Sequence, residues 1–529
     1  MKDIDFKISF DISSAGSGCG MRLGDIDGDG RMEIILAKPA PVSDPRYFSH
    51  QVASVTAYTV DGEMLWQVGD ASGDEKATDI DLPIQVYDLD KDGKNEVIVV
   101  MDGNLLVLDG KTAEIKKQIP LPDKYIGGTI LIADLEGTGY PQNIILKNKY
   151  SHIWALDVNL NILWDAEGNV GLSPIAYDLN GDGKDEIIAG YNVFSNSGEL
   201  LWKIDYPDHA NSALVECIYK QDEPIVIIYG PVIRAYTKDG ELLWEIPESA
   251  KNIVIGKFRD NIDAFDILVL DSMSLFDNKG NFLYQKNENV YLPTPVANFD
   301  ESGRLYIAGH KQEDVLTTIY DGYMRGVYTL PTFGNIASGD ILGDGKSQII
   351  IYNDETIDIY SRIETDYNEP ARPYSRPQSK QYYNFSIYNT VPDSQISTGL
   401  VVDDFASQNI VKWASSYSSI NMYNSFAKVS RSEFVLLLAT LLSLKEDFSE
   451  NFADVSKDEA YYDAVGTFKA LGVLYSEDNL FSPDTPITVA GANDILDRLS
   501  IPINFNFDEK YELSKQDMAK LILNITTAE

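Results

Sequence analysis

The first two thirds of the chain alternate between short apolar runs and polar turns. Through residues 1–390 the runs are about five or six residues long and rich in β-branched residues, and the turns contain Gly, Asp and Asn. No long helical period appears before residue 400. The pattern therefore predicts many short strands in this region.

One phrase, an acidic turn followed by a β-branched run, recurs along this region. Clear copies occupy residues 24–36, 88–98 and 178–188. Degenerate copies begin near Asp134, Lys257, Asn298 and Asp340, and a copy without the acidic turn lies near Glu216. Most copies are separated by about 42 residues, and with about four strands per copy this is the period of a β-propeller blade. The eight copies predict eight blades, or seven if the weak copy near Lys257 is not counted.

A second phrase, of the type Gly-Glu-Leu-Leu-Trp, lies between copies of the first. It occurs at residues 61–66, 160–164, 198–202 and 239–244, with a variant at 280–284. Four of the six tryptophans occupy this one register. Aromatic side chains at a fixed repeat position usually pack, so we expect these tryptophans between neighbouring blades.

The N-terminal segment Phe6–Phe10 alternates like a strand. We expect it to pair with the last blade, because closing the ring removes exposed sheet edges. The predicted fold is mainly β, an eight-bladed propeller (seven-bladed in the alternative count) over residues 1–390, followed by a small α-helical domain over residues 391–529.

The pattern becomes helical from about residue 395. An apolar helix is predicted at residues 432–442 and another through residues 462–471, followed by Phe-Ser-Pro-Asp-Thr-Pro-Ile-Thr at 481–488. This order resembles an S-layer homology module, and residues 429–434 and 513–518 resemble further copies. The resemblance implies attachment to a cell-wall polymer. The alternative is a domain that only packs against the propeller, since Val-Ala-Gly-Ala stands at 489–492 where the family has Thr-Arg-Ala-Glu.

Charge and composition exclude several function classes. The chain has 82 acidic and 43 basic residues, a net charge of −39, which argues against nucleic-acid binding. No apolar run reaches membrane-spanning length, so we expect no transmembrane segment. The N-terminus lacks the apolar core of a signal peptide, so the chain is expected to be cytoplasmic or to have lost a targeting segment. Two cysteines, Cys19 and Cys217, exclude a disulfide scaffold.

The three clear acidic turns carry oxygen ligands at alternate positions. Counted from the first Asp, side-chain oxygens fall at positions 1, 3, 5 and 9, a carbonyl is available at 7, and Gly at 6 permits the reversal. Position 12 is Leu36, Val99 or Ala189, so these turns are not EF-hands. We predict short calcium loops whose ligands are Asp25, Asp27, Asp29, Arg31 and Glu33, then Asp88, Asp90, Asp92, Lys94 and Glu96, and Asp178, Asn180, Asp182, Lys184 and Glu186. The alternative is that Asp, Asn and Gly here only make turns. In the degenerate copy at Asp134, we expect Glu136, Thr138 and Gln142 to replace the acids and to leave no tight site.

The propeller region resembles a known enzyme family. The most specific stretch is residues 174–190, followed by Gly-Glu-Leu-Leu-Trp at 198–202 and Asp-His-Ala at 208–210; residues 23–36 and 381–389 are also similar. These phrases resemble the family 11 polysaccharide lyases over about residues 20–390. The resemblance implies a secreted or surface-located, calcium-loaded eight-bladed propeller that cleaves rhamnogalacturonan. The chain departs from the family at residues 343–348, where Gly-Asp-Trp-Arg-Glu-Glu is replaced, and at 208–211, where His-Gly-Asp-Ala is replaced.

Eliminative cleavage removes the C5 proton of a uronic acid, so it needs a base and a cation or Arg to neutralise the sugar carboxylate. The candidate bases are His209 and Lys38, with the tyrosines and Lys346 as further options. The alternative for His209 is a surface or loop histidine, and for Lys38 a solvated lysine. The basic-aromatic stretch 371–380 suits an anionic glycan, with Arg372, Tyr374 and Arg376 as substrate-binding candidates; its alternative is a proline-rich crossing loop.

Three functions remain open on the sequence. The first is a calcium-dependent lyase acting on uronic-acid polysaccharide at the cell surface. The second is a non-catalytic calcium-stabilised propeller that binds carbohydrate or protein. The third, a pyrroloquinoline-quinone scaffold, fits worst, because such repeats do not normally carry Asp-x-Asp-Gly-Asp-Gly turns.

Overall fold

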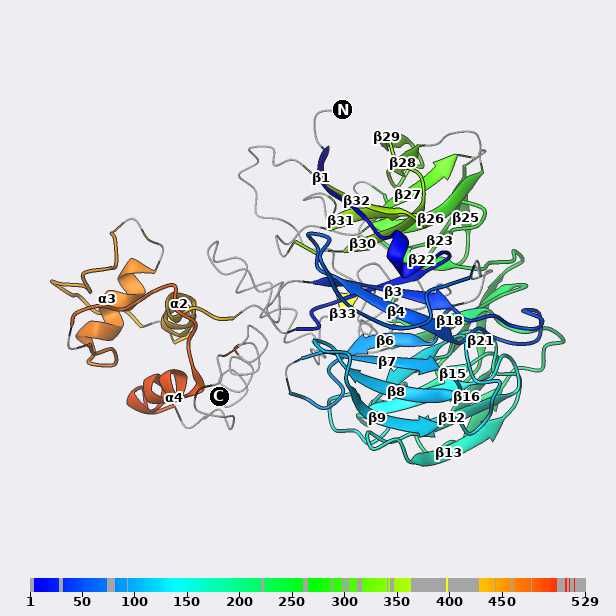
Figure 1. Cartoon of the computed structure of the whole chain (residues 1–529), viewed down its shortest axis with the longest axis horizontal. Helices are drawn as coiled ribbons and strands as arrows, with labels where there is room; N and C mark the ends of the chain where they lie inside the picture. The colour runs from blue at the N-terminus through cyan, green and yellow to red at the C-terminus, as the bar shows by residue number, and fades with distance from the viewer. Residues whose placement is uncertain are drawn as a thin grey trace. The chain divides into compact units, whose positions relative to one another are not determined.

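The computed structural model describes residues 4–27, 32–73, 81–92, 94–219, 223–259, 265–286, 289–296, 299, 304–311, 316–339, 341–342, 347–362, 396–397, 428–442, 444–457, 459, 461–476, 478–501, 510, 513 and 518. The chain divides into an N-terminal region, residues 1–401, and a C-terminal region, residues 402–529. The N-terminal region is built of strands and the C-terminal region of helices (Figure 1), so the mainly β class predicted from the sequence is confirmed.

Thirty-two strands of the N-terminal region form eight groups of four neighbours, which we call β-units 1–8. β-unit 1 contains β2 (Gly20–Gly24), β3 (Glu33–Pro39), β4 (Val52–Tyr58) and β5 (Met64–Gly69), and β-unit 2 contains β6 (Ile84–Tyr87), β7 (Glu96–Met101), β8 (Asn104–Asp109) and β9 (Ile115–Pro120). β-unit 3 contains β10 (Ile130–Ala133), β11 (Asn143–Lys147), β12 (His152–Leu156) and β13 (Ile162–Glu167), and β-unit 4 contains β14 (Ile175–Tyr177), β15 (Glu186–Ala189), β16 (Asn192–Phe194) and β17 (Leu200–Lys203). A single bridge, Val52 with Met101, joins β-units 1 and 2 into one sheet.

The other four β-units follow the same order along the chain. β-unit 5 contains β18 (Ser212–Glu216), β19 (Ile225–Tyr229), β20 (Ile233–Thr237) and β21 (Leu242–Ile246), and β-unit 6 contains β22 (Ile253–Gly256), β23 (Asp266–Val269), β24 (Ser274–Asp277) and β25 (Phe282–Gln285). β-unit 7 contains β26 (Val290–Val296), β27 (Tyr306–Lys311), β28 (Thr317–Tyr320) and β29 (Gly326–Leu330). β-unit 8 contains β30 (Asn335–Gly339), β31 (Gln348–Tyr352), β32 (Thr356–Arg362) and the first strand of the chain, β1 (Ile4–Asp11). A short 3₁₀ helix, η1 (Ser13–Ala15), follows β1, and β33 (Ile396–Ser397) pairs in parallel with β2.

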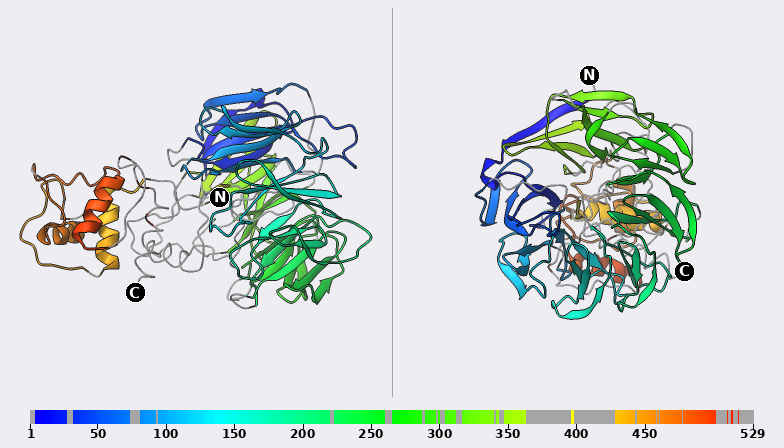
Figure 2. Two further views of the ribbon diagram at one scale, coloured as in Figure 1. Left: turned by 90° about the horizontal axis from the view of Figure 1, so that it is seen from below. Right: turned by 90° about the vertical axis from the view of Figure 1, so that its right-hand side faces the viewer.

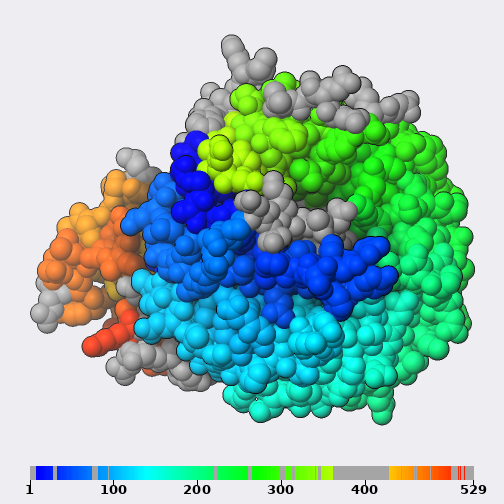
Figure 3. All heavy atoms as spheres, turned by 45° about the vertical axis from the view of Figure 1, so that its right-hand side comes forward, coloured from blue at the N-terminus to red at the C-terminus, as the bar shows by residue number. Residues whose placement is uncertain are grey.

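The β-units are arranged around a common centre, as the right-hand view of Figure 2 shows. The first strand of the chain closes the arrangement. β1 pairs antiparallel with β32 along seven residues, from Ile4 with Arg362 to Asp11 with Thr356. Figure 3 shows the N-terminal atoms beside those of the last β-unit. The predicted pairing of residues 6–10 with the last blade is therefore confirmed, and it covers a strand edge that would otherwise be open.

Burial follows the same pattern in successive β-units. The second strand of most β-units is wholly buried, as in β3, β7, β11 and β15. In β-units 1, 3, 4 and 5 the fourth strand exposes most of its residues and half-buries its Trp. Each such Trp packs beside the core between two β-units, and Nε1 of Trp66 donates to the carbonyl of Gly110 in the next β-unit at 2.8 Å. The predicted packing of these tryptophans is confirmed.

Antiparallel order gives the N-terminal region two faces. The connections between first and second strands, which carry the acidic turns, emerge on the face that we call the acidic face. The connections between second and third strands, and those between successive β-units, emerge on the opposite face. The acidic turns and the candidate bases His209 and Lys38 therefore lie at opposite ends of the strands.

The C-terminal region contains α2 (Arg431–Leu441), α3 (Tyr462–Ala470) and α4 (Val489–Arg498), which share one buried core. The helices predicted at 432–442 and 462–471 match α2 and α3. Ser430 and Glu433 form a capping box at the start of α2, and Thr488 caps α4. None of the described helices is long and apolar enough to cross a membrane.

Candidate functional site

The last side chain of each acidic turn closes the turn on itself. We number these turns by β-unit, so that loop 1 is 25–33, loop 2 is 88–96, loop 3 is 134–143, loop 4 is 178–186 and loop 8 is 340–348. In each, the last residue accepts a hydrogen bond from the backbone N–H of the second: Glu33 from Ile26 (2.9 Å), Glu96 from Leu89 (2.8 Å), Asn143 from Leu135 (2.9 Å), Glu186 from Leu179 (2.8 Å) and Gln348 from Ile341 (2.8 Å). Because an amide oxygen accepts this bond as well as a carboxylate does, the closure needs no negative charge.

Loop 3 is one residue longer than its counterparts. Asn143, rather than the predicted Gln142, occupies the closing position, and the prediction for Gln142 is wrong. Gln142 instead donates from Nε2 to the carbonyl of Leu89 at 2.7 Å. The backbone N–H groups of Thr138 and Gly139 donate to the carboxylate of Asp134 at 3.0 and 2.7 Å. The expectation that this copy holds no tight site stays a prediction.

Neighbouring loops are tied to one another by hydrogen bonds. Nδ2 of Asn95 donates to the backbone carbonyl of Asp25 at 2.8 Å. The hydroxyl of Tyr140 donates to the backbone carbonyl of Asp88 at 2.5 Å. Asp185 makes two bonds to Asp134, one through its own N–H (2.9 Å) and one through Oδ2 (2.8 Å). In loops 1, 2 and 3 the first residue is therefore held by the next β-unit, which couples the geometry of these loops to packing between β-units.

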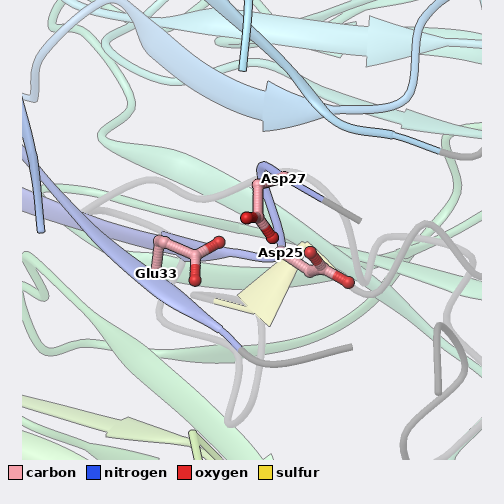
Figure 4. Close-up of side chains that lie close together, drawn as sticks. All are labelled: Asp25, Asp27 and Glu33. Atoms are coloured by element: carbon pink, nitrogen blue, oxygen red, sulfur yellow. The ribbon is translucent and has the colours of Figure 1, made fainter. Parts of the chain in front are cut away.

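Loop 1 gathers three carboxylates close together. Asp25 and Glu33 are 1% and 4% exposed, Asp27 is partly buried, and each offers an oxygen within 4.8 Å of the others. Figure 4 shows the three side chains grouped at the loop. The ammonium of the exposed Lys111 lies 3.5 Å from Oδ2 of Asp27. Buried clustered carboxylates need a cation, so the donor set fits calcium. Asp29 and Arg31 lie outside the described residues.

Loop 2 contains a similar acidic cluster, but an ammonium of the chain lies in it. Asp88, Asp90 and Glu96 each offer an oxygen within 4.8 Å of the others. Nζ of Lys116, on β9, lies 2.5 Å from Asp90, 2.7 Å from Glu96 and 3.5 Å from Asp92. Burial raises the pKa of Glu96 to about 7 against the opposing effect of Lys116. Hydrogen bonds to Asp90 and Glu96 outweigh burial and raise the pKa of Lys116 above its ordinary value. Lys94 lies in this loop, and its N–H bonds Asp92 at 2.9 Å.

Loop 4 satisfies its acids with groups of the loop itself. The carboxylate of Asp178 accepts from the N–H groups of Gly181 (2.7 Å), Asp182 (3.1 Å) and Gly183 (3.0 Å). Nδ2 of Asn180 donates to Asp182 at 3.3 Å and to Glu186 at 3.0 Å. The N–H of Lys184 bonds Asp182 at 2.9 Å. These bonds place the Asn180 amide between Asp182 and Glu186. Unlike the acids of loops 1 and 2, Asp178, Asp182 and Glu186 do not form a group whose oxygens all lie within 4.8 Å of one another.

His209 is the most exposed of the four histidines and lies on the opposite face. Its side chain is 36% exposed, and Nδ1 lies 2.9 Å from Oδ1 of Asp208. Its ring packs 4.8 Å from that of Tyr150, over which the ammonium of Lys149 lies at 5.4 Å. Burial raises the pKa of Tyr150 and lowers that of Lys149. Sequence reasoning identified His209 but missed Lys149 and Tyr150, which only the fold brings to it.

The rings of the other three histidines are engaged in contacts with neighbouring groups of the protein. His310 is fully buried and Nε2 lies 2.6 Å from the carbonyl of Gly334. His152 stacks on Trp154 at 4.1 Å and pairs with Asp165 at 2.7 Å. His50 is 4% exposed and Nδ1 lies 2.7 Å from the carbonyl of Ala40.

Lys38 lies at the end of β3 and is 1% exposed. Its ammonium donates to the carbonyls of Ser17 (3.2 Å) and Gly73 (3.0 Å), so it joins two segments on the opposite face. These contacts favour a structural role. Arg372, Tyr374 and Arg376, together with Lys346, lie outside the described residues.

Comparisons with known proteins support the predicted resemblance. Residues 13–117 match the family model "Rhamnogalacturonan lyase family 11, C-terminal domain". No curated protein matches the sequence. Among solved structures, the exotype rhamnogalacturonan lyase YesX has 18% identity and a TM-score of 0.52, with 67% of this chain and 76% of that chain covered. The V. cholerae biofilm matrix protein Bap1 has 13% identity and a TM-score of 0.52, with 74% and 97% covered. The Bacillus licheniformis rhamnogalacturonan lyase PL11 has 17% identity and a TM-score of 0.48, with 72% and 80% covered. The chain is therefore rhamnogalacturonan lyase-like in residues 13–117 and in fold.

Proposed function

We propose that this chain is an extracellular, calcium-dependent eight-bladed propeller that binds uronic-acid polysaccharide of the rhamnogalacturonan type and cleaves it by β-elimination. The eight β-units are the blades. The observation that carries the proposal is the match of residues 13–117 to the family 11 lyase model, because that segment contains loop 1, loop 2 and Lys38.

Loop 1 is the proposed calcium site. Asp25, Asp27 and Glu33 would hold the ion, and Asp29 together with the carbonyl of Arg31 would complete the set. Bound calcium would neutralise three clustered carboxylates in a protein whose net charge is −39. Glu33 serves a second purpose, since its Oε2 also fixes the turn through the N–H of Ile26.

The opposite face is the proposed glycan-binding surface. It carries exposed rings beside cations: Phe48 stacks on Tyr125 at 4.7 Å, and the ammonium of Lys124 lies 4.8 Å from the Tyr125 ring. Tyr150 and His209 form a second pair of rings on this face, while the neighbouring Lys149 is 5% exposed and donates to the carbonyl of Pro45. Aromatic faces pack against sugar rings, and nearby cations offset the charge of sugar carboxylates, which an acidic protein would otherwise repel.

His209 is the proposed base on this surface. Nδ1 faces Asp208, which orients the ring and stabilises the charge that forms when Nε2 takes a proton. The proton leaves C5 of the uronic acid, its electron pair forms the C4–C5 double bond, and the C4–O bond to the leaving sugar breaks. Tyr150 is partly exposed and lies where it can contact the substrate next to the imidazole.

A non-catalytic glycan-binding propeller is the second candidate. The solved structure of the biofilm matrix protein Bap1 has a TM-score of 0.52 and 97% of it is covered, so the fold is not confined to lyases. Lys38 also favours this candidate, because its ammonium is engaged by two backbone carbonyls instead of facing a substrate.

For the C-terminal region we propose an S-layer-homology-like domain that contacts a cell-wall polymer. The family residues that survive as Arg431 and Glu433 have packing roles here: Arg431 lies over the Phe481 ring at 5.2 Å and donates to its carbonyl at 2.9 Å, and Glu433 completes the capping box. Sedimentation of the region with purified cell walls tests this part separately, and no sedimentation would refute it.

One experiment separates the two candidates. The chain is incubated with rhamnogalacturonan and other uronides in calcium, the ultraviolet absorbance of the unsaturated product is followed, and glycan retention is measured in parallel. Product formation supports the lyase. Retention without product supports the binder. Neither product nor retention on any uronide refutes both.

A further inference from the structure

Lys116 is a cation of the chain placed inside an acidic loop. Its ammonium lies 2.5 Å from Asp90 and 2.7 Å from Glu96, with Asp92 at 3.5 Å. Lys116 is 26% exposed, and Glu96 is 1% exposed. Oxygens on three side chains of one loop therefore converge on one positive group that comes from the fourth strand of the same β-unit.

The repeat shows that this cation is a replacement. In β-unit 2 the pairing of the third strand with the fourth shifts by one residue at a bulge, and Lys116 is the residue at that bulge. The fourth strands of β-units 1, 3, 4 and 5 have the same bulge, and there the residue is Leu: Leu65, Leu163, Leu201 and Leu243. The following position is Trp in all four and Lys117 in β-unit 2. Lys117 makes the contact that Trp makes in other β-units. Its Nζ donates to the carbonyl of Val158 in the next β-unit at 2.7 Å, as Nε1 of Trp66 donates to the carbonyl of Gly110. Lys117 is therefore explained by packing between β-units, and Lys116 is not.

β-unit 6 contains a second case in which the chain supplies its own cation to a loop acid. Asp266 is the first residue of β23, as Glu96 is of β7, and it is fully buried. Arg259, in the turn between β22 and β23, donates to both of its oxygens, at 2.8 and 2.7 Å. A side-chain cation on the acid that ends this turn is thus found twice in the fold, once from the fourth strand of the β-unit (Lys116) and once from the turn itself (Arg259).

We propose that Lys116 occupies the cation position of loop 2 in place of a divalent ion, so that this loop takes no calcium while the side chain is present. An ammonium 2.5–2.7 Å from two carboxylates blocks the space that a calcium ion would need and repels its charge. Loop 2 is a latent calcium site, opened by removing one side chain.

The test is calcium stoichiometry of the full chain by equilibrium dialysis, with calcium up to about 10 mM, above the range of weak extracellular sites. Lys116→Leu restores the residue of four other β-units and is expected to bind one more calcium than the wild type. Its melting temperature is expected to fall in chelator and to recover with calcium. Lys116→Arg keeps the cation and is expected to bind no additional ion. Lys117→Leu removes the same charge from the neighbouring position and is the matched control, with wild-type stoichiometry. An unchanged stoichiometry in Lys116→Leu overturns the proposal.

A second measurement needs no change at Lys116, in case that variant does not fold. In the otherwise wild-type chain, Asp90→Asn is expected to leave calcium stoichiometry unchanged, because loop 2 holds no ion. Loss of one equivalent in Asp90→Asn overturns the proposal. The inference does not depend on loop 1: if the wild type binds no calcium but Lys116→Leu binds one, the proposed function loses its calcium site and the role of Lys116 stands.

Discussion

Lys147 places an amino group inside the sheet core, and its ionisation should be visible in the stability of the protein. The side chain is 1% exposed, and Nζ donates to the carbonyl of Lys149 at 2.8 Å. Among the described residues, no carboxylate lies within ion-pair distance of it. Burial, together with the charge of Lys149, lowers the pKa of Lys147 to about 7.

The sign of the pH dependence follows from this shift. Between about pH 7 and the ordinary lysine pKa near 10.4, the unfolded chain holds a proton that the folded chain has lost. Stability must therefore rise with pH in this window, by about 1.4 kcal/mol per pH unit for one proton. Below about pH 7 both states are protonated, and the full cost of the buried charge is present.

The assay is chemical denaturation of the wild type and Lys147→Met from pH 6 to pH 10. Met keeps the apolar stem and removes the charge, and it leaves the Lys149 carbonyl without this donor at a cost of about 1 kcal/mol that does not depend on pH. The variant is expected to be the more stable protein at pH 6, and its advantage should shrink by about 1.4 kcal/mol per unit above pH 7. A difference between the two proteins that stays constant from pH 6 to pH 10 would refute the reasoning.

Three further predictions concern the loops, the opposite face and the packing between β-units. Chelation should lower the melting temperature of the wild type, and Asp27→Asn should abolish that response; an equal response in both proteins would exclude calcium from loop 1. His209→Ala should reduce the rate of unsaturated product formation by about 10²-fold or more, whereas His152→Ala should not, because His152 is engaged by Trp154 and Asp165; equal effects in the two variants would dismiss His209 as the base. Trp66→Phe should cost about 1 kcal/mol of unfolding free energy through the bond lost to the carbonyl of Gly110, and unchanged stability would show that this bond contributes nothing.

The repeats made the architecture predictable. Each acidic turn and each Leu-Leu-Trp phrase marks a fixed place in a four-stranded unit, so strand order follows from their spacing. The pairing of residues 6–10 with the last β-unit could also be predicted from the sequence. A segment with the alternation of a strand needs a partner, and the ring would otherwise leave a sheet edge open.

The contents of the loops were less predictable, because they depend on residues distant in sequence. Lys116 lies 20 residues after Glu96, at a position that the repeat marks as Leu, and only the bulged pairing of β8 with β9 brings it to the loop. Asn143 replaces Gln142 at the closing position because loop 3 is longer by one residue, which spacing counted from its first Asp does not reveal. Lys38 carries no sequence signal for its two carbonyl partners, since they belong to separate loops.

The central claim is that one face of the ring holds calcium in loop 1 and the other binds an acidic glycan. A crystal structure of the chain soaked with calcium and a rhamnogalacturonan oligosaccharide tests both parts at once. The account predicts an ion among Asp25, Asp27 and Glu33 and a uronic acid beside Tyr150 and His209. A loop 1 without an ion at saturating calcium, or an oligosaccharide bound only on the acidic face, would contradict it.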